Sequence, residues 1–257
     1  MKKIKLTISF LLFVNLVYCQ NSDFLKNYFP ISLKLGVSQF TGIENSHYRE
    51  DLYYNFNNFI SPVVGLEYDF LKLDNFNFKT GLYATLIKEN DKYFFSQQET
   101  GFGYDLEGRI KVTTDGMFRL SVPITSEYLI PTKIGILTLN ASFIMGYHNE
   151  FGEGFTEYDT ATIDGEQRLN YKNVYSRYSA PWYFNGQIGV GMYFPFDRWM
   201  LRTNIFYNQA FQKLYEGEYQ FTHLLQSPDF GGTFGFKGNS YGIEFSLYLP
   251  KRKKDKS

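Results

Sequence analysis

Apolar and polar side chains alternate with a period of two through most of the chain, and this pattern excludes most folds. Such alternation places every second side chain on one face and is typical of β-strands. After residue 20, no helical spacing of apolar residues appears. The pattern predicts eight strands of about ten residues, the length that a tilted strand needs to cross a bilayer. They cover residues 31–38, 60–70, 76–86, 118–127, 137–146, 182–194, 199–208 and 241–249.

The connections between these segments alternate strictly between short and long. Residues 71–75, 130–133 and 195–198 are short turns, whereas residues 41–57, 90–115, 149–180 and 212–237 are long and polar. An even number of strands then puts both termini at the short-turn end. We therefore expect an all-β fold, an eight-stranded antiparallel up-and-down transmembrane β-barrel with short periplasmic turns and long extracellular loops.

Alternation alone does not say which face is buried, because a soluble barrel such as a lipocalin has the same period with its apolar side inside. Here the polar phase is rich in Gly, Ser, Thr, Asn, Gln and Tyr, which suits a crowded interior. Its charges balance and predict ion pairs in the lumen. The basic members are Lys34, Lys79, Arg119 and Arg202, and the acidic ones are Glu67, Asp69, Glu127 and Glu244.

Aromatic residues gather at the strand ends in the apolar phase, as in the interfacial girdles of membrane proteins. Trp199 marks the short-turn end and Trp182 the long-loop end. With Trp199 we group Phe70, Phe76, Tyr128 and Phe194, and with Trp182 we group Phe59, Tyr147 and Tyr207. Residues 178–196 carry no charge, but their apolar residues alternate and are interrupted by Pro and Gly, so we predict a strand there and no helix. A soluble sandwich with an aromatic core is the alternative.

The first 19 residues read as a signal peptide, with Lys2, Lys3 and Lys5 preceding a short apolar run. Cleavage after Cys19 is the reading we adopt. Lipidation of Cys19 and a retained anchor stay open, although bulky Tyr18 argues against lipidation. The predicted organisation is a signal peptide (1–19), a periplasmic N-terminal segment (20–30), the outer-membrane β-barrel (31–250) and a basic periplasmic tail (251–257).

The net charge of zero separates into local excesses along the chain. The whole chain has 26 basic and 26 acidic residues, which does not suit a nucleic-acid binder. Each of the four long connections is acidic, whereas the tail is basic. Expected partners are outer-membrane lipid and proteins that contact the extracellular loops or the periplasmic face, with no nucleic acid. A single Cys excludes a disulfide framework and a multi-cysteine zinc site.

The leader, the eight alternating segments and a fourth segment reading FRLSVPITSEYLIP resemble small bacterial outer-membrane barrels of the PorT-like and OmpX/OmpA-like kind. The most specific part is Leu120 to Pro123, followed by Glu127 and Tyr128. The resemblance covers residues 30–250 and implies a bacterial outer-membrane location and a porin-like family, with no site residues. The chain departs from many such barrels by ending on KRKKDKS instead of an aromatic residue.

Residues that carry chemistry are few, and no motif of a hydrolase or a metalloprotease is present. An enzyme would have to use the polar residues of the long connections, which are Ser46, His47, Asp51, His148, Asp159 and His223. The three histidines are expected to be solvated. We therefore predict no enzyme, no catalytic or metal-binding residue and no cofactor.

The sequence supports a non-enzymatic outer-membrane barrel with a structural, adhesion or assembly role through its extracellular loops. Secretion-associated assembly is one branch of this hypothesis, because the PorT-like resemblance implies it. An outer-membrane enzyme with a loop-borne site and a soluble lipocalin-like binder are the alternatives.

Overall fold

The computed structural model describes residues 22–46, 52–58, 60–87, 89–100, 106–110, 117–148, 154–163, 166–178, 181–196, 198–222 and 230–251. These residues form fourteen strands, one 3-10 helix and one short α-helix. The elements are η1 (Ser22–Asn27), β1 (Tyr28–Ser46), β2 (Leu52–Asn58), β3 (Ile60–Lys72), β4 (Phe76–Ile87), β5 (Glu89–Phe95), α2 (Gln97–Thr100), β6 (Leu106–Ile110), β7 (Met117–Pro131), β8 (Ile136–His148), β9 (Gly154–Ile163), β10 (Glu166–Tyr178), β11 (Trp182–Pro195), β12 (Met200–Ala210), β13 (Tyr215–Thr222) and β14 (Phe230–Pro250).

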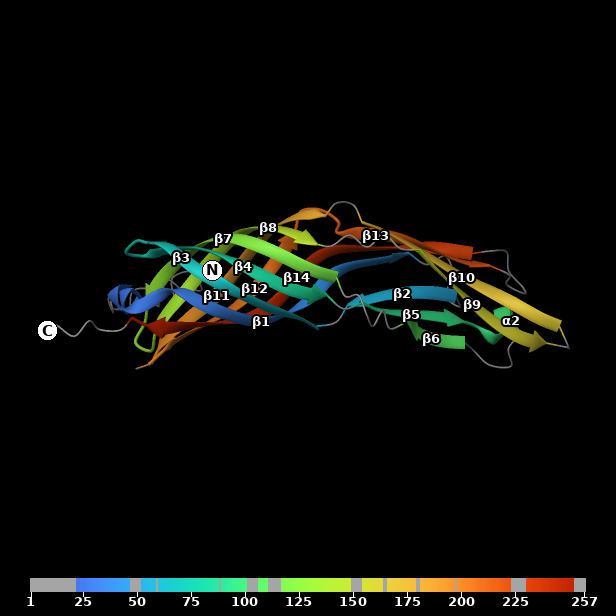
Figure 1. Cartoon of the computed structure of the whole chain (residues 1–257), viewed down its shortest axis with the longest axis horizontal. Helices are drawn as coiled ribbons and strands as arrows, with labels where there is room; N and C mark the ends of the chain where they lie inside the picture. Colours follow the sequence, from blue (N-terminus) through green and yellow to red (C-terminus); the bar gives the residue numbers. More distant parts are fainter. Residues whose placement is uncertain are drawn as a thin grey trace, which may run out of the picture.

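Eight of these strands close into a barrel. They follow one another in the order β1, β3, β4, β7, β8, β11, β12 and β14, and β14 pairs with β1 to complete the circle (Figure 1). Every neighbouring pair is antiparallel. Each alternating segment of the sequence corresponds to one of the eight strands. The predicted fold class, an eight-stranded antiparallel up-and-down barrel, is confirmed.

The three short connections are tight turns, as predicted. Each is closed by a backbone hydrogen bond of 2.8–2.9 Å: from Leu73 N to Phe76 O, from Thr132 N to Gly135 O and from Phe196 N to Trp199 O. Lys251 N donates to Asn27 O at 2.8 Å, so both ends of the barrel chain lie at the short-turn end.

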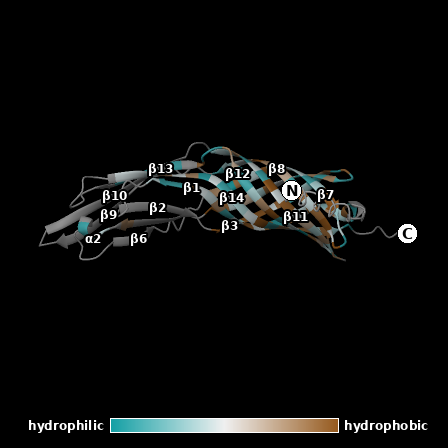
Figure 2. Cartoon of the chain, turned by 180° about the vertical axis from the view of Figure 1, so that it is seen from behind, coloured by the Kyte–Doolittle hydropathy of each residue, from teal (hydrophilic) through white to brown (hydrophobic). Residues whose placement is uncertain are grey.

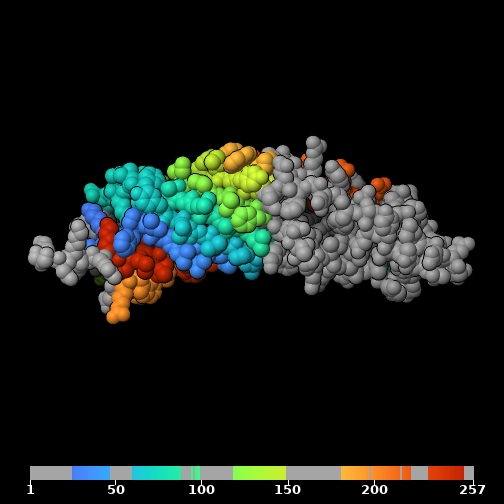
Figure 3. Space-filling view, viewed as in Figure 1, coloured from blue at the N-terminus to red at the C-terminus, as the bar shows by residue number. Residues whose placement is uncertain are grey.

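The outside of the barrel is apolar and its inside is polar. Ile60, Ile188 and Ile205 are 63%, 64% and 66% exposed, whereas their polar neighbours along the strands are buried. Figure 2 shows the apolar residues as brown bands around the barrel, and Figure 3 shows one face of the barrel as a continuous surface of side chains. This orientation fits a barrel that crosses a membrane and is the reverse of the lipocalin-like alternative.

Aromatic rings occupy both rims of this apolar belt. At the short-turn end the rings of Phe196 and Trp199 stack with centroids 4.0 Å apart. At the opposite rim the rings of Tyr147 and Trp182 meet edge to face at 5.4 Å. The two tryptophans thus lie at opposite rims of the barrel, as expected. Phe59, assigned to the same rim, lies outside the described residues.

The prediction that the long connections are loops is wrong for much of their length. Strands β13, β10 and β9 continue the barrel sheet beyond its rim through β14, while β2, β5 and β6 form a second sheet. Figure 1 shows both at the end of the barrel opposite η1. We call this part of the molecule the extension. Strand β13 joins the first of these sheets because β14 continues past the rim, paired with β1 as far as Ser46 and Thr233, and β10 and β9 follow β13.

Two prolines lie inside strands, where the missing N–H group predicts a bulge or a local gap, and a gap in the pairing is found at Pro123. The ladder of β4 and β7 has Thr80 opposite Ile124 and then Tyr83 opposite Ser121, so Pro123 falls in the gap between them. Pro62 pairs with β1 but precedes the first residue of β3 that pairs with β4.

Candidate functional site: a filled lumen and a polar pocket above it

A buried charge network fills the lumen near the short-turn end, and we call it the lower layer. Glu127 forms an ion pair with Lys79 Nζ at 2.9 Å and another with Arg202 Nε at 2.7 Å. The hydroxyls of Tyr193 and Tyr248 accept hydrogen bonds from Lys79 Nζ at 2.5 and 3.1 Å. Tyr193 in turn donates to Glu127 at 2.7 Å. All five side chains are at most 2% exposed, so the network closes the lumen at this level.

A second network, the middle layer, lies nearer the centre of the barrel. Lys34 Nζ lies between two carboxylates, 3.2 Å from Glu67 Oε1 and 2.8 Å from Glu244 Oε2. Glu67 also accepts hydrogen bonds from Tyr83 at 2.7 Å and from Ser246 at 2.6 Å. A buried carboxylate is tolerated only when its charge and lone pairs are satisfied in this way. The predicted lumen ion pairs are therefore confirmed in both layers.

Arg119 forms the upper layer, at the long-loop end, without a carboxylate partner among the described residues. Its guanidinium lies 3.8 Å from the ring centroid of Tyr183 and 5.5 Å from that of Phe40. Such stacking compensates part of the cost of burying a cation. The cavity beside it has about 50 Å³, which is room for a few water molecules.

Two tyrosines that fill the lumen depend on glycines in the neighbouring strand. Tyr83 lies over Gly65 and Tyr183 lies over Gly146, and each pair is directly opposite in the ladder. A Cβ atom on either glycine would overlap the tyrosine ring. The glycines are thus required by the close approach of an aromatic ring.

The N-terminal segment that contains η1 covers the short-turn mouth of the barrel below the lower layer. Leu25 of η1 is 2% exposed and packs in an apolar cluster with Tyr28, Leu129, Ile136, Tyr193, Met200 and Tyr248. Lys72 Nζ donates to Leu25 O at 3.2 Å and Lys251 Nζ donates to Lys26 O at 2.8 Å. Two lysines thus hold the last turn of η1 through its carbonyl groups.

A polar pocket of about 530 Å³ lies above the barrel, on strands β1, β13 and β14. In the ladder, Glu44 and Glu216 flank Gly235, and Ser46 and Glu218 flank Thr233. These residues share one face of the sheet because side chains alternate along each strand. The opposite face carries Phe234 and Phe236, which are buried, so the charged face points away from the interior.

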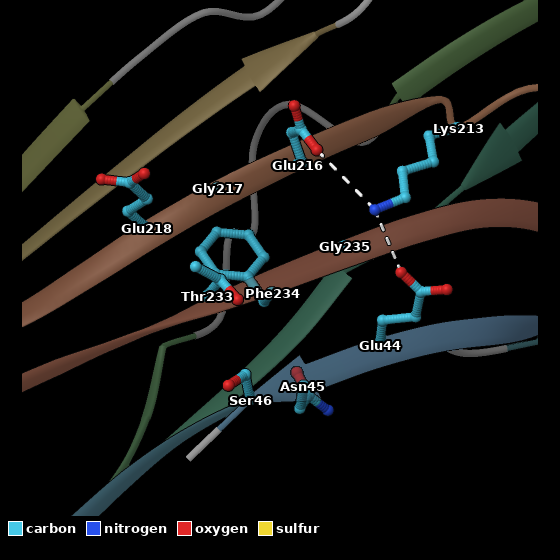
Figure 4. A pocket seen from close by; sticks show the side chains of 10 residues that line it. All are labelled: Glu44, Asn45, Ser46, Lys213, Glu216, Gly217, Glu218, Thr233, Phe234 and Gly235. Carbon is cyan, nitrogen blue, oxygen red and sulfur yellow. Dashed lines mark ion pairs between the residues drawn. The ribbon is translucent and has the colours of Figure 1, made fainter. Parts of the chain in front are cut away.

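Lys213 joins two acidic residues of this pocket, as Figure 4 shows, and Lys237 pairs with one of them. Lys213 Nζ lies 3.1 Å from Glu44 and 3.8 Å from Glu216, and Lys237 Nζ lies 2.5 Å from Glu44. Hydrogen bonds from Lys237 and Lys213 lower the pKa of Glu44, and those to Glu44 raise the pKa of Lys213. Any stability from the lowered pKa of Glu44 is present above the ordinary carboxyl pKa and is lost as the pH falls through the lowered value. The pairs are solvent-exposed, so this contribution is small.

The structure locates only part of the hypothetical enzyme site. Ser46 ends β1, Asp159 lies on β9, and His47, Asp51 and His223 lie outside the described residues. His148 was expected to be solvated, and this expectation is wrong. It ends β8 with no exposed surface, its ring stacked on Tyr183 at 6.2 Å, because the barrel wall continues to this residue. No group of three or more His, Cys, Asp or Glu side chains that could hold a metal ion occurs among the described residues.

The pocket was missed because its residues were assigned to loops. A signal for one of its strands was nevertheless present, since Tyr215, Gly217, Tyr219 and Phe221 alternate with Glu216, Glu218 and Gln220. The glycine-rich residues 231–235 concealed the matching part of β14. No helix within the described residues is long and apolar enough to span a membrane.

Comparison with known proteins does not assign a family. No family model and no curated protein matches the chain. Among solved structures, the transport unit of the autotransporter AIDA-I from Escherichia coli is 8% identical, with 95% of this chain and 97% of that chain covered and a TM-score of 0.27. The CymD monoaromatic hydrocarbon channel is 10% identical, with 89% and 90% covered and a TM-score of 0.16. These TM-scores are too low to support a fold assignment, so the fold is assigned from the strand pairing described above.

Proposed function

We propose that this chain is a non-enzymatic bacterial outer-membrane barrel that does not conduct solutes and acts through its extension. The observation that carries the proposal is the contrast between a filled lumen and a lipid-compatible outer wall. Three layers of buried side chains and the η1 cluster occupy the interior, so solutes have no continuous path. What is left for interaction with other molecules is the extension and the periplasmic face.

Two measurements on the purified full chain test the barrel part of this proposal. The folded protein should migrate differently on a gel before and after boiling, as compact barrels do, and should remain in the detergent phase on partition. Planar bilayers that contain the protein should show no conductance above background. Steady unitary current steps, in preparations that pass the migration test, would contradict a closed lumen.

The extension is the part that we assign to adhesion or assembly. Its β-strands form a platform beyond the aromatic rim, with a polar pocket on one face. In intact cells, an external protease should cleave the extension and leave the barrel strands protected. Deletion of the gene should reduce attachment between cells or assembly of surface proteins, and the full chain should restore it. Unchanged attachment and assembly in the deletion strain would remove this role.

Because the sequence resembles PorT-like barrels, one form of the proposed assembly role is participation in protein secretion. For that branch we expect the deletion strain to retain secreted cargo in the periplasm. Normal release of cargo by the deletion strain would exclude the secretion role, and adhesion or a structural role would remain. The outer-membrane location after cleavage of residues 1–19 is part of the same proposal, and the N-terminal sequence of the mature protein tests it, with Gln20 as the expected first residue.

The absence of enzymatic activity is also a proposal. Alanine replacement of His47, His148 and His223 together should leave any hydrolase or acyltransferase activity of the purified protein at background. An activity that the wild-type chain has and this variant lacks would favour the enzyme alternative. Because His148 is buried, the variant with His148 retained and the other two replaced separates loss of activity from loss of folding.

A further inference from the structure

The cavity of about 50 Å³ in the lumen lies between the middle layer and the upper layer. All eight strands of the barrel contribute to its lining. A buried water molecule needs about 10–15 Å³ of such volume, so the cavity has room for one small ion together with one or two water molecules. Most of its wall is polar, with side chains from Ser38, Thr85, Arg119, Ser121, Asn185, Gln187, Asn208, Ser240 and Glu244.

Arg119 is the cation of this wall that lacks an anionic partner among the described residues. Its side chain is buried, with 4% of the residue exposed, and its Nε has no hydrogen-bond acceptor within the described part of the chain. The rings of Tyr183 and Phe40 attract the guanidinium but carry no net charge. A buried charge that is neither paired nor fully hydrogen-bonded is costly, so this position favours an anion.

The other charges in the lumen and at its short-turn mouth already balance one another. Their ion pairs contain four cations and four carboxylates among the described residues. The cations are Lys34, Lys72, Lys79 and Arg202, and the carboxylates are Glu67, Asp69, Glu127 and Glu244. Glu244 also lines the cavity, but Lys34 neutralises it at 2.8 Å and the Asn204 amide donates to it at 3.2 Å. Arg119 therefore leaves one positive charge in excess.

We propose that the cavity beside Arg119 binds a single small monovalent anion of the halide class. One negative charge matches the excess positive charge, and the volume suits an ion of the size of chloride or bromide. The hydroxyl groups of Ser121 and Ser240 and the amide groups of Asn185 and Asn208 supply further donors. The bound anion makes the upper layer a neutral layer of the closed lumen. This inference concerns the lumen alone and does not depend on the role of the extension.

Urea unfolding of the full chain in lipid vesicles tests the site, with bromide as the probe. The protein is refolded in sodium gluconate, whose anion is too large for the cavity, and bromide then replaces gluconate at constant ionic strength. A ligand that binds only the folded state raises the folding equilibrium constant in proportion to its concentration above the dissociation constant. We expect about a tenfold rise in that equilibrium constant for each tenfold rise in bromide. An unchanged unfolding midpoint would overturn the proposal.

Variants of the chain locate the effect. Arg119→Met removes the unpaired cation, so in gluconate it should be at least as stable as wild type, and bromide should no longer shift its midpoint. Ser121→Val keeps Arg119 but narrows the cavity and should weaken the bromide response. The matched control is Thr138→Val, an isosteric change of a buried lumen residue outside the cavity lining, which should keep the full response.

Two results of these variants would contradict the site. A bromide response of Arg119→Met equal to that of wild type would show a general salt effect, and so would an undiminished response of Ser121→Val. If Arg119→Met does not fold, the comparison of Ser121→Val with Thr138→Val decides the question alone.

Anomalous diffraction from crystals grown in bromide shows the anion directly. We expect a bromide peak in the cavity beside the guanidinium of Arg119. Density for water alone at this place would overturn the proposal. Gel migration before and after boiling and the conductance of planar bilayers report on the barrel and its closed lumen independently. A failure of the anion site is thereby distinguished from a failure of the proposed function.

Discussion

Replacement of Glu127 tests the physical account of the lumen most severely. Its carboxylate is fully buried and neutralises Lys79 and Arg202 at once, at 2.9 and 2.7 Å. Glu127→Leu leaves two buried cations without this partner and removes the acceptor of the Tyr193 hydroxyl. Removing one partner of a buried pair costs about 3–5 kcal/mol. We expect the free energy of unfolding to fall by about 4 kcal/mol.

The assay is urea unfolding of the full chain refolded into lipid vesicles, followed by the fluorescence of Trp182 and Trp199. Glu218→Gln is the control, because this exposed residue should change stability by less than about 0.5 kcal/mol. The triple variant Lys79→Met, Glu127→Leu and Arg202→Met removes all three charges and should recover most of the loss. A single Glu127→Leu variant within about 1 kcal/mol of wild type would refute the reasoning.

Three further predictions address the lumen, the outer wall and the pocket. Gly146→Val should displace the ring of Tyr183 and lower stability by about 1–3 kcal/mol, measured by the same urea unfolding, and an unchanged midpoint would contradict the ring's position. Ile188→Arg should reduce stability in vesicles by about 2–4 kcal/mol if this residue faces the bilayer midplane, whereas no loss would mean that it does not. Replacing Lys237→Met should raise the pKa of Glu44 towards its ordinary 4.5, followed by carboxyl NMR, and an unchanged titration would show that this ion pair does not persist in solution.

The barrel could be predicted from sequence because its two faces meet different solvents. A strand with lipid on one side and a crowded polar lumen on the other must alternate apolar and polar side chains. The apolar Ile188 is therefore expected on the outside of the barrel and the polar Gln187 in the lumen. Turn positions followed from the interruptions of this pattern. Charge balance within the polar phase predicted the ion pairs, since unpaired charges in such an interior would be too costly.

Much of the extension could not be predicted in the same way, because strands such as β9 and β10 contain consecutive polar residues, as in Thr156 and Glu157, and their alternation is weaker. Glu44 and Lys213 looked like ordinary solvated loop residues. Their contact arises because β1 and β14 pair beyond the rim, which no local pattern determines. His148 shows the same limit, since its burial depends on Tyr183 from a strand that is distant in sequence.

The orientation of side chains along β11 tests the central claim, an apolar wall that faces lipid around a filled lumen, most directly. The mature chain predicted here has no cysteine, so single cysteines placed in turn at residues 184–190 carry a nitroxide label without interference. In vesicles, collision with lipid-soluble oxygen should be high at Phe184, Ile188 and Val190 and low at Asn185 and Gln187, with a period of two. A water-soluble relaxant should reach none of the five. High access of that relaxant at Ile188 would contradict the membrane barrel.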